Sequence, residues 1–64
     1  MANYTRAVRK ALKEAGWQFE RYGKGDHERW INPTTGGKVT VDADIRSRHT
    51  ANGILIEAGL RKKF

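Results

Sequence analysis

The sequence predicts an α+β fold with the element order α-β-β-β-α, in which a three-stranded antiparallel sheet carries two helices on one face. Three observations support this prediction. Segments with apolar residues at helical spacing lie near both ends of the chain, three short β-type segments lie between them, and glycine-rich turns separate the β-type segments. A chain of 64 residues buries only a small core, so we expect one domain over residues 1–64.

The first helix is expected from about Asn3 to Ala15, with Gly16 as its C-terminal cap. Apolar residues occur at the i, i+3, i+4, i+7 positions of one helical face: Val8, Ala11, Leu12 and Ala15. Basic residues repeat this spacing on the opposite face: Arg6, Arg9, Lys10 and Lys13. This basic face is either a solvated outer surface or a ridge that binds phosphates or an acidic partner.

Three strands are expected to follow as an antiparallel meander. Aromatic residues alternate with polar ones over residues 17–22, which predicts a half-buried first strand that ends at Tyr22. The turn "GKG" leads to a second strand over about His27 to Ile31. The turn "NPTTGG" leads to a third strand over Lys38 to Val41, because the pattern there is alternating and β-branched.

The second helix is expected from Arg48 or His49 to Ala58, ending at Gly59. Its apolar face consists of Ala51, Ile54, Leu55 and Ala58. Ile56 falls off this face, which indicates either an isolated surface residue or a contact with a partner protein. The tail "RKKF" either folds back on the domain or extends freely.

Composition and charge narrow the function classes. The formal charge of +6 and the pI near 10.2 favour a polyanionic partner, and nucleic acid is the first to consider. The absence of cysteine excludes disulfides and cysteine-based zinc sites, and two histidines alone make a poor metal site, so no metal or cofactor is expected. The longest apolar run has three residues, so we expect no membrane span and a cytoplasmic location.

The stretch "GDHERW" contains the candidate catalytic residue, His27. If Trp30 points into the core, alternation sends Glu28 inward or to the rim, and sends His27 and Arg29 to the open face of the sheet. The hairpin is expected to bring Lys24 close to them. A base, an acid and cations are what metal-free RNA cleavage requires, and an imidazole suits the proton transfers near neutral pH. The alternative is an exposed histidine with no catalytic task.

The other histidine, His49, lies near the start of the second helix, where Ser47 or Thr50 is expected to cap the first turn. A positive imidazolium is disfavoured there by the helix dipole. We therefore favour a capping or orienting role for His49 over a catalytic one.

The combined motifs "EAGW", "GKGDHERW", "NPTTG" and "SRHTANGILIEAGL" resemble the HicA family of type II toxins, also called the YcfA-like family, over roughly residues 5–60. The resemblance implies a fold similar to double-stranded-RNA-binding domains and a ribonuclease that cleaves mRNA. It also implies inhibition by a HicB antitoxin, with DNA contacted only through that antitoxin. The family's Gly-x-His motif falls on His27, which the resemblance makes the catalytic residue.

The sequence departs from the family pattern at two places. Many members have serine where this chain has Asp26, and many have Pro-x-His where this chain reads Asp42-Ala43-Asp44. A carboxylate beside His27 orients the ring or raises its basicity, or it repels phosphate.

The leading hypothesis is therefore a metal-independent endoribonuclease. In this interpretation His27 transfers protons, Lys24 and Arg29 hold the phosphate, and the basic residues of the first helix extend the RNA-binding surface. The alternatives are a non-catalytic RNA-binding module of the same fold, and a protein that acts only through a regulatory complex.

Overall fold

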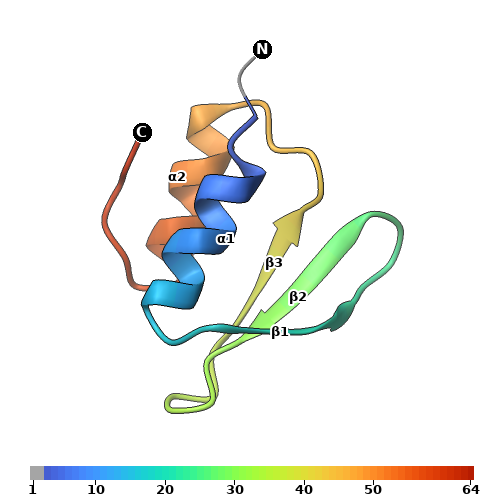
Figure 1. Cartoon of the computed structure of the whole chain (residues 1–64), viewed down its shortest axis with the longest axis vertical. Coiled ribbons are helices and arrows are strands. Elements are labelled where there is room, and N and C mark those ends of the chain that lie inside the picture. Colours follow the sequence, from blue (N-terminus) through green and yellow to red (C-terminus); the bar gives the residue numbers. More distant parts are fainter. Residues whose placement is uncertain (1–2) are drawn as a thin grey trace.

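The computed structural model of the chain describes residues 3–64 and has the predicted element order (Figure 1). The predicted domain range also covers Met1 and Ala2, which lie outside the described residues. The elements are α1 (Thr5–Glu14), β1 (Gln18–Tyr22), β2 (His27–Ile31), β3 (Lys38–Asp42) and α2 (Arg48–Glu57). The predicted bounds of all five elements agree with these to within two residues.

The three strands form one antiparallel sheet in the order β1-β2-β3, so β2 is the central strand. Both helices lie on the same face of the sheet and pack on each other, and α2 packs on β3 (Figure 1). No helix or strand of residues 3–64 covers the other face (Figure 1). The predicted α+β fold class is therefore confirmed.

A single apolar cluster lies between the helices and the sheet. Its fully buried members include Val8 and Leu12 from α1, Trp30 and Val41 from the sheet, and Leu55 from α2. Each comes from a position that the sequence pattern assigns to the inner face of its element, because burial of apolar surface is the main driving force for folding.

The first strand differs from the expectation. The sequence predicted a half-buried strand, but all five residues of β1 are exposed, and the buried aromatic of this segment is Trp17, just before the strand. Within residues 3–64, β1 is an edge strand that pairs with β2, and the helices leave its side chains exposed. Alternation of aromatic and polar residues predicted the strand correctly, but it did not show whether a helix would cover it.

Both helices end as predicted at a glycine. Gly16 has φ +92° and Gly59 has φ +77°, a left-handed conformation that favours glycine. The amide that follows each glycine donates back into the helix: Trp17 N to Leu12 O at 2.9 Å and Leu60 N to Leu55 O at 2.8 Å. This Schellman geometry satisfies carbonyls at the helix ends and turns the chain sharply.

The C-terminal tail folds back over the helices, which settles the alternatives that the sequence left open. Asn52 of α2 is buried, and its side-chain oxygen accepts from the amides of Lys63 and Phe64, both at 3.1 Å. Its amide nitrogen donates to Phe64 O at 3.0 Å. The Phe64 ring lies 4.9 Å from the ring of Tyr4, so the tail closes the end of the core near the start of α1.

We expect Asn52→Ala to lower the free energy of unfolding by about 1–3 kcal/mol, because the substitution leaves backbone amides of the tail without their acceptor. Urea denaturation followed by circular dichroism measures this change. Thr50→Ala, on the exposed face of the same helix, is the matched control and is expected to have little effect. Equal stabilities of the two variants would contradict a structural role for Asn52.

Candidate functional site

His27 occupies the first position of β2 and is exposed, as the sequence predicts. The turn before it contains Gly25 with φ +69°, and the Gly23 amide donates to His27 O at 2.8 Å. The chain therefore reverses tightly at this hairpin and enters β2 at the imidazole.

The imidazole contacts a carboxylate across the sheet. His27 lies directly opposite Asp42 of β3, and its Nδ1 is 2.7 Å from Asp42 Oδ1. Side chains of directly opposed residues in an antiparallel pair lie on the same face, so the strand register itself produces this contact. The His27 side chain is 52% exposed. With Nδ1 engaged, Nε2 is the nitrogen available to a ligand, since no hydrogen bond within residues 3–64 reaches it.

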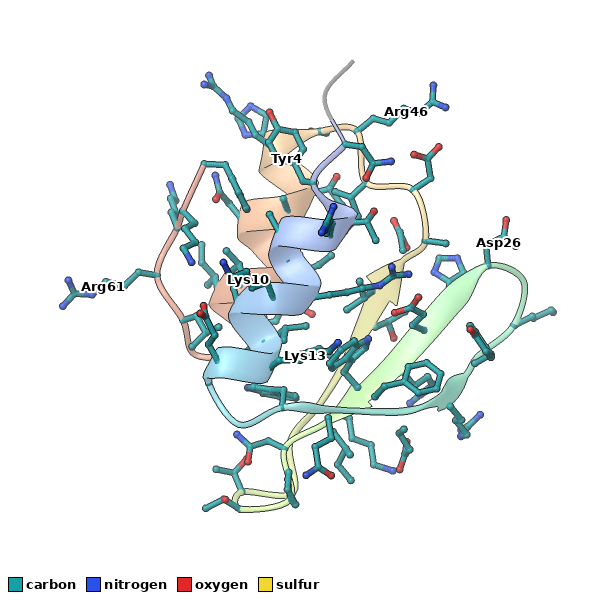
Figure 2. All side chains as sticks on the ribbon, in the orientation of Figure 1. Tyr4, Lys10, Lys13, Asp26, Arg46 and Arg61 are labelled. Atoms are coloured by element: carbon teal, nitrogen blue, oxygen red, sulfur yellow. The ribbon has the colours of Figure 1, made fainter. Side chains whose placement is uncertain are left out.

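The carboxylate that contacts the ring is not the one adjacent in sequence. Asp26 precedes His27, but its side chain extends outward from the turn between β1 and β2 (Figure 2). The Asp26 carbonyl instead accepts from the Ala43 amide at 3.2 Å, which joins the turn to the chain after β3. A carboxylate does therefore orient the ring, and it comes from Asp42.

Glu28 and Trp30 of β2 are buried against the helices. Because side chains alternate along a strand, Arg29 lies on the opposite face, the same face as His27. Its Nε atom is buried and has no hydrogen-bond partner within the described chain. A Cβ at Gly23 would lie 3.4 Å from Arg29 Cγ, an ordinary contact distance, so the Arg29 side chain passes next to the turn at Gly23. Arg29 is thus held under the hairpin as a cation without a carboxylate partner among residues 3–64.

Lys24 is exposed in the turn three residues before His27. It forms no ion pair within the part of the chain that the structure describes. The hairpin therefore places a lysine near the strand start, and the direct contact of the imidazole is with Asp42.

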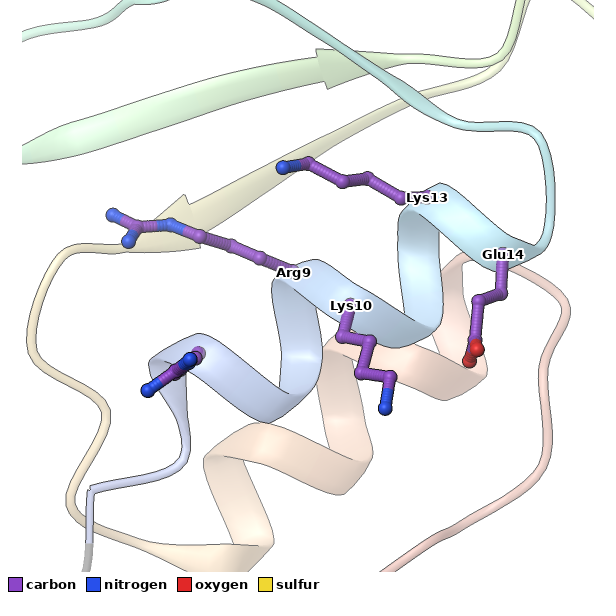
Figure 3. Close-up of a pocket in the computed structure, with 5 residues that line it drawn as sticks. Arg9, Lys10, Lys13 and Glu14 are labelled. Atoms are coloured by element: carbon purple, nitrogen blue, oxygen red, sulfur yellow. The ribbon is translucent and has the colours of Figure 1, made fainter.

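The four predicted basic residues of α1 do not act as one uniform face. Arg9 and Lys13 extend from α1 toward the sheet, whereas Lys10 and Glu14 extend to the other side of the helix (Figure 3). Together with Arg6 they line a hollow of about 450 Å³. Arg6, Lys10 and Lys13 are exposed and unpaired within residues 3–64, and Arg9 is engaged by a carboxylate.

That carboxylate is Glu28, which is only 5% exposed on β2. Arg9 donates to both of its oxygens, and Trp30 Nε1 donates to Oε1 at 2.9 Å. Burial by itself raises the pKa of Glu28, but the hydrogen bonds from Arg9 and Trp30 and the charges of Arg9 and Lys13 outweigh it. The pKa of Glu28 is therefore lower than its ordinary value, and the ionised pair ties α1 to the central strand.

His49 lies in the first turn of α2, and its backbone amide donates to Ser47 Oγ at 3.2 Å. Ser47 is thus the cap, and Thr50 is not. The cap depends on the His49 backbone, and the imidazole is exposed with no hydrogen bond within the described chain.

Residues 3–64 contain no group of three or more His, Asp or Glu side chains placed to hold a metal ion. No described helix has the length and apolar character needed to cross a membrane.

The fold and this site define a small basic α+β protein with an accessible histidine on the uncovered face of its sheet. Residues 5–60 match a family described as "HicA toxin of bacterial toxin-antitoxin". Comparisons with curated proteins and with solved structures gave no match. Because the family match covers most of the chain, the protein belongs to the HicA toxin family, and it is a toxin of the toxin-antitoxin type.

Sequence reasoning missed Asp42 as a site residue. It ended the third strand at Val41, whereas β3 continues through Asp42. A signal was present in the sequence: counting back from the "NPTTGG" turn pairs Ile31 with Lys38, and the same register then pairs His27 with Asp42.

The Glu28 pair makes stability depend on pH in a defined direction. Because the pKa of Glu28 is lower in the folded protein than in the unfolded chain, its carboxylate stabilises the fold above about pH 4.5, and this contribution is lost as the pH falls through the folded pKa. We expect Glu28→Gln to reduce the free energy of unfolding at pH 7 by about 1–3 kcal/mol and to flatten its decrease below pH 4.5.

Urea denaturation at a series of pH values measures both effects. Glu57→Gln is the matched control, because Glu57 is exposed and forms no ion pair within residues 3–64. If Glu28→Gln followed the parent curve at every pH, the Arg9–Glu28 pair would not stabilise the fold.

Proposed function

We propose that this toxin is a metal-independent endoribonuclease that cleaves mRNA with His27 as its catalytic residue, and that a HicB-type antitoxin neutralises it. The observation that carries this proposal is the exposed imidazole of His27, whose Nδ1 is engaged by Asp42 at 2.7 Å while Nε2 is accessible. Membership of the HicA toxin family supports the same conclusion.

The chemistry follows from this geometry. With Nδ1–H donated to Asp42, Nε2 carries the lone pair and accepts the proton of an RNA 2′-hydroxyl. The 2′-oxygen attacks the adjacent phosphorus, and the bond to the 5′-oxygen breaks. The protonated imidazole then returns its proton to the departing 5′-oxygen, so the products are a 2′,3′-cyclic phosphate and a free 5′-hydroxyl. The proton count balances with one histidine and no other acid.

Charge on the phosphate increases during this attack, and a fixed cation nearby stabilises it. Arg29 is the best-placed candidate, because it lies on the same face two residues from His27 and has no carboxylate partner within the described chain. Lys24 in the exposed turn supplies a second positive charge. The contact with Asp42 fixes the ring and compensates the charge that His27 gains.

The antitoxin is expected to carry acidic groups that face the unpaired cations of α1 and the hairpin, because complementary charge guides association and competes with RNA for the same surface. mRNA as the substrate places the reaction in the cytoplasm. A small acidic protein encoded beside this chain would be consistent with such a partner.

We expect His27→Ala to abolish toxicity on induction and to lower RNA cleavage by about 10²- to 10⁴-fold, because it removes the group that transfers both protons. Growth after induction and the integrity of total RNA measure the two effects. His49→Ala is the matched control and is expected to retain activity. Retained toxicity of a folded His27→Ala protein would exclude His27 from the mechanism, and RNA binding without cleavage by the parent protein would indicate a binding module.

We expect Asp42→Asn to lower the cleavage rate by about tenfold or more while RNA affinity stays equal or increases. The rate falls because the imidazole loses its charged partner, and affinity does not fall because a negative charge near the phosphate is removed. Single-turnover cleavage measures the rate. RNA binding by Asp42→Asn in the non-cleaving His27→Ala background measures the affinity.

Asp26→Asn is the matched control for this experiment. It removes the same charge one residue from His27, but Asp26 does not contact the ring. Equal rates for the Asp42→Asn and Asp26→Asn proteins would show that the contact between the strands has no role in the reaction.

A further inference from the structure

The inner side of β1 carries an exposed aromatic pair. Tyr22 is 72% exposed and Phe19 is 43% exposed, and their ring centroids are 5.0 Å apart in an edge-to-face arrangement. The centroid of the Phe19 ring also lies 6.1 Å from that of Trp30, the buried aromatic residue of β2. The pair therefore extends the aromatic edge of the core into solvent.

A strand irregularity puts both rings on the same face. The register between β1 and β2 shifts between Phe19 and Arg21, so Phe19 pairs with Trp30 and Tyr22 pairs with Glu28. Residues three apart in a regular strand point to opposite faces, but the bulge at Glu20 adds one residue and restores the same side. Bulges are frequent at sheet edges and beside functional sites, where they redirect a side chain.

These rings form one wall of a groove of about 280 Å³ between β1 and α1. The lining residues are Arg9, Lys13, Phe19, Tyr22, Glu28 and Trp30. Glu28 neutralises Arg9, so Lys13 supplies the uncompensated charge of the groove, and its Nζ lies 6.0 Å from the centre of the Trp30 ring. The groove thus combines flat apolar rings with an ammonium group.

The chemistry of the groove fits one nucleotide of a single strand. Proteins that bind single-stranded nucleic acid pair aromatic platforms for the bases with cations that follow the phosphates. The exposed large apolar side chains of this groove, Phe19 and Tyr22, are both aromatic. The exposed large aliphatic side chain of the described residues, Ile56, lies elsewhere, on α2. The hollow along α1 adjoins the groove, because both are lined by Arg9 and Lys13. Its other lining residues are Arg6, Lys10 and Glu14.

The position of the groove connects it to the candidate site. Tyr22 is the last residue of β1 and His27 is the first residue of β2, so the groove ends at the hairpin that carries the imidazole. The groove lies on the inner side of the sheet and His27 on the uncovered face, so an RNA strand bound in the groove would have to pass around this hairpin to reach the imidazole.

We propose that the groove between β1 and α1 is a binding subsite for single-stranded RNA, in which an unpaired base stacks on the exposed ring of Tyr22 and contacts Phe19, and a phosphate contacts Lys13. This inference deepens the proposed function, because the bound strand is the substrate that His27 cleaves. It also specifies unpaired RNA, since bases within a duplex are stacked on each other and do not offer their faces to a protein.

The test is a binding measurement that does not depend on cleavage. In a His27→Ala background, we expect Tyr22→Ala to weaken binding of a single-stranded dodecaribonucleotide by about tenfold and Tyr22→Phe to retain affinity, because stacking needs the ring and not the hydroxyl. Lys13→Ala is expected to reduce the salt dependence of binding by about one counterion. Fluorescence anisotropy at several salt concentrations measures both.

An abasic oligonucleotide of the same length identifies stacking as the cause. Tyr22→Ala is expected to leave its affinity unchanged, and Ile56→Ala, on the exposed surface of α2, is expected to leave both oligonucleotides unaffected. Circular dichroism verifies that each variant is folded. We expect Tyr22→Ala to fold, because the Tyr22 side chain is mostly exposed in the parent protein.

The outcomes separate this inference from the proposed function. The subsite would be overturned if Tyr22→Ala bound the oligonucleotide as tightly as the His27→Ala background does. It would also be overturned if Tyr22→Ala weakened binding of the abasic oligonucleotide as much as binding of the normal one. Weaker binding of a HicB-type antitoxin with unchanged RNA affinity would also overturn it, and would make the groove a protein-docking surface. Base-dependent binding by a parent protein that does not cut RNA would support the subsite and contradict the endoribonuclease.

Discussion

The buried carboxylate of Glu28 is the constraint on which the rest of the structure depends. It lies on the central strand, accepts hydrogen bonds from Arg9 of α1 and from Trp30, and is almost removed from water. A buried charge is tolerated only when it is paired and hydrogen-bonded, so the pair fixes one specific placement of α1 over β2. It also fixes which face of β2 points inward.

That choice of face determines the candidate site. Side chains alternate along a strand, so burying Glu28 and Trp30 directs His27 and Arg29 to the uncovered face. A slip of one residue would exchange the two sets and place the imidazole in the core. The pairing of β2 with β3 then brings Asp42 to Nδ1 of His27. The inner network and the outer contact therefore depend on the same strand register.

The same network shapes the groove on the inner side. Because Glu28 neutralises Arg9, the positive charge available to a ligand there comes from Lys13, beside the exposed rings of β1. The small size of the fold makes such a groove possible, since two helices of ten residues each bury the inner residues of β2 and β3 but leave β1 exposed. A family of toxins that must meet both RNA and an antitoxin has use for a surface of this kind.

The sequence by itself determined the element order, the inner faces of both helices and the glycine caps, because periodicity and left-handed glycine positions are local properties of the chain. It also placed His27 and Arg29 on the open face, since Trp30 had only one favourable side. The register counted from the "NPTTGG" turn offered Asp42 as the residue opposite His27. The sequence could not decide that the two side chains come into contact, that Glu28 binds Arg9, or that β1 remains uncovered. Each of these depends on which residues of separate elements meet, and only the tertiary packing of α1 and β3 against β2 decides that.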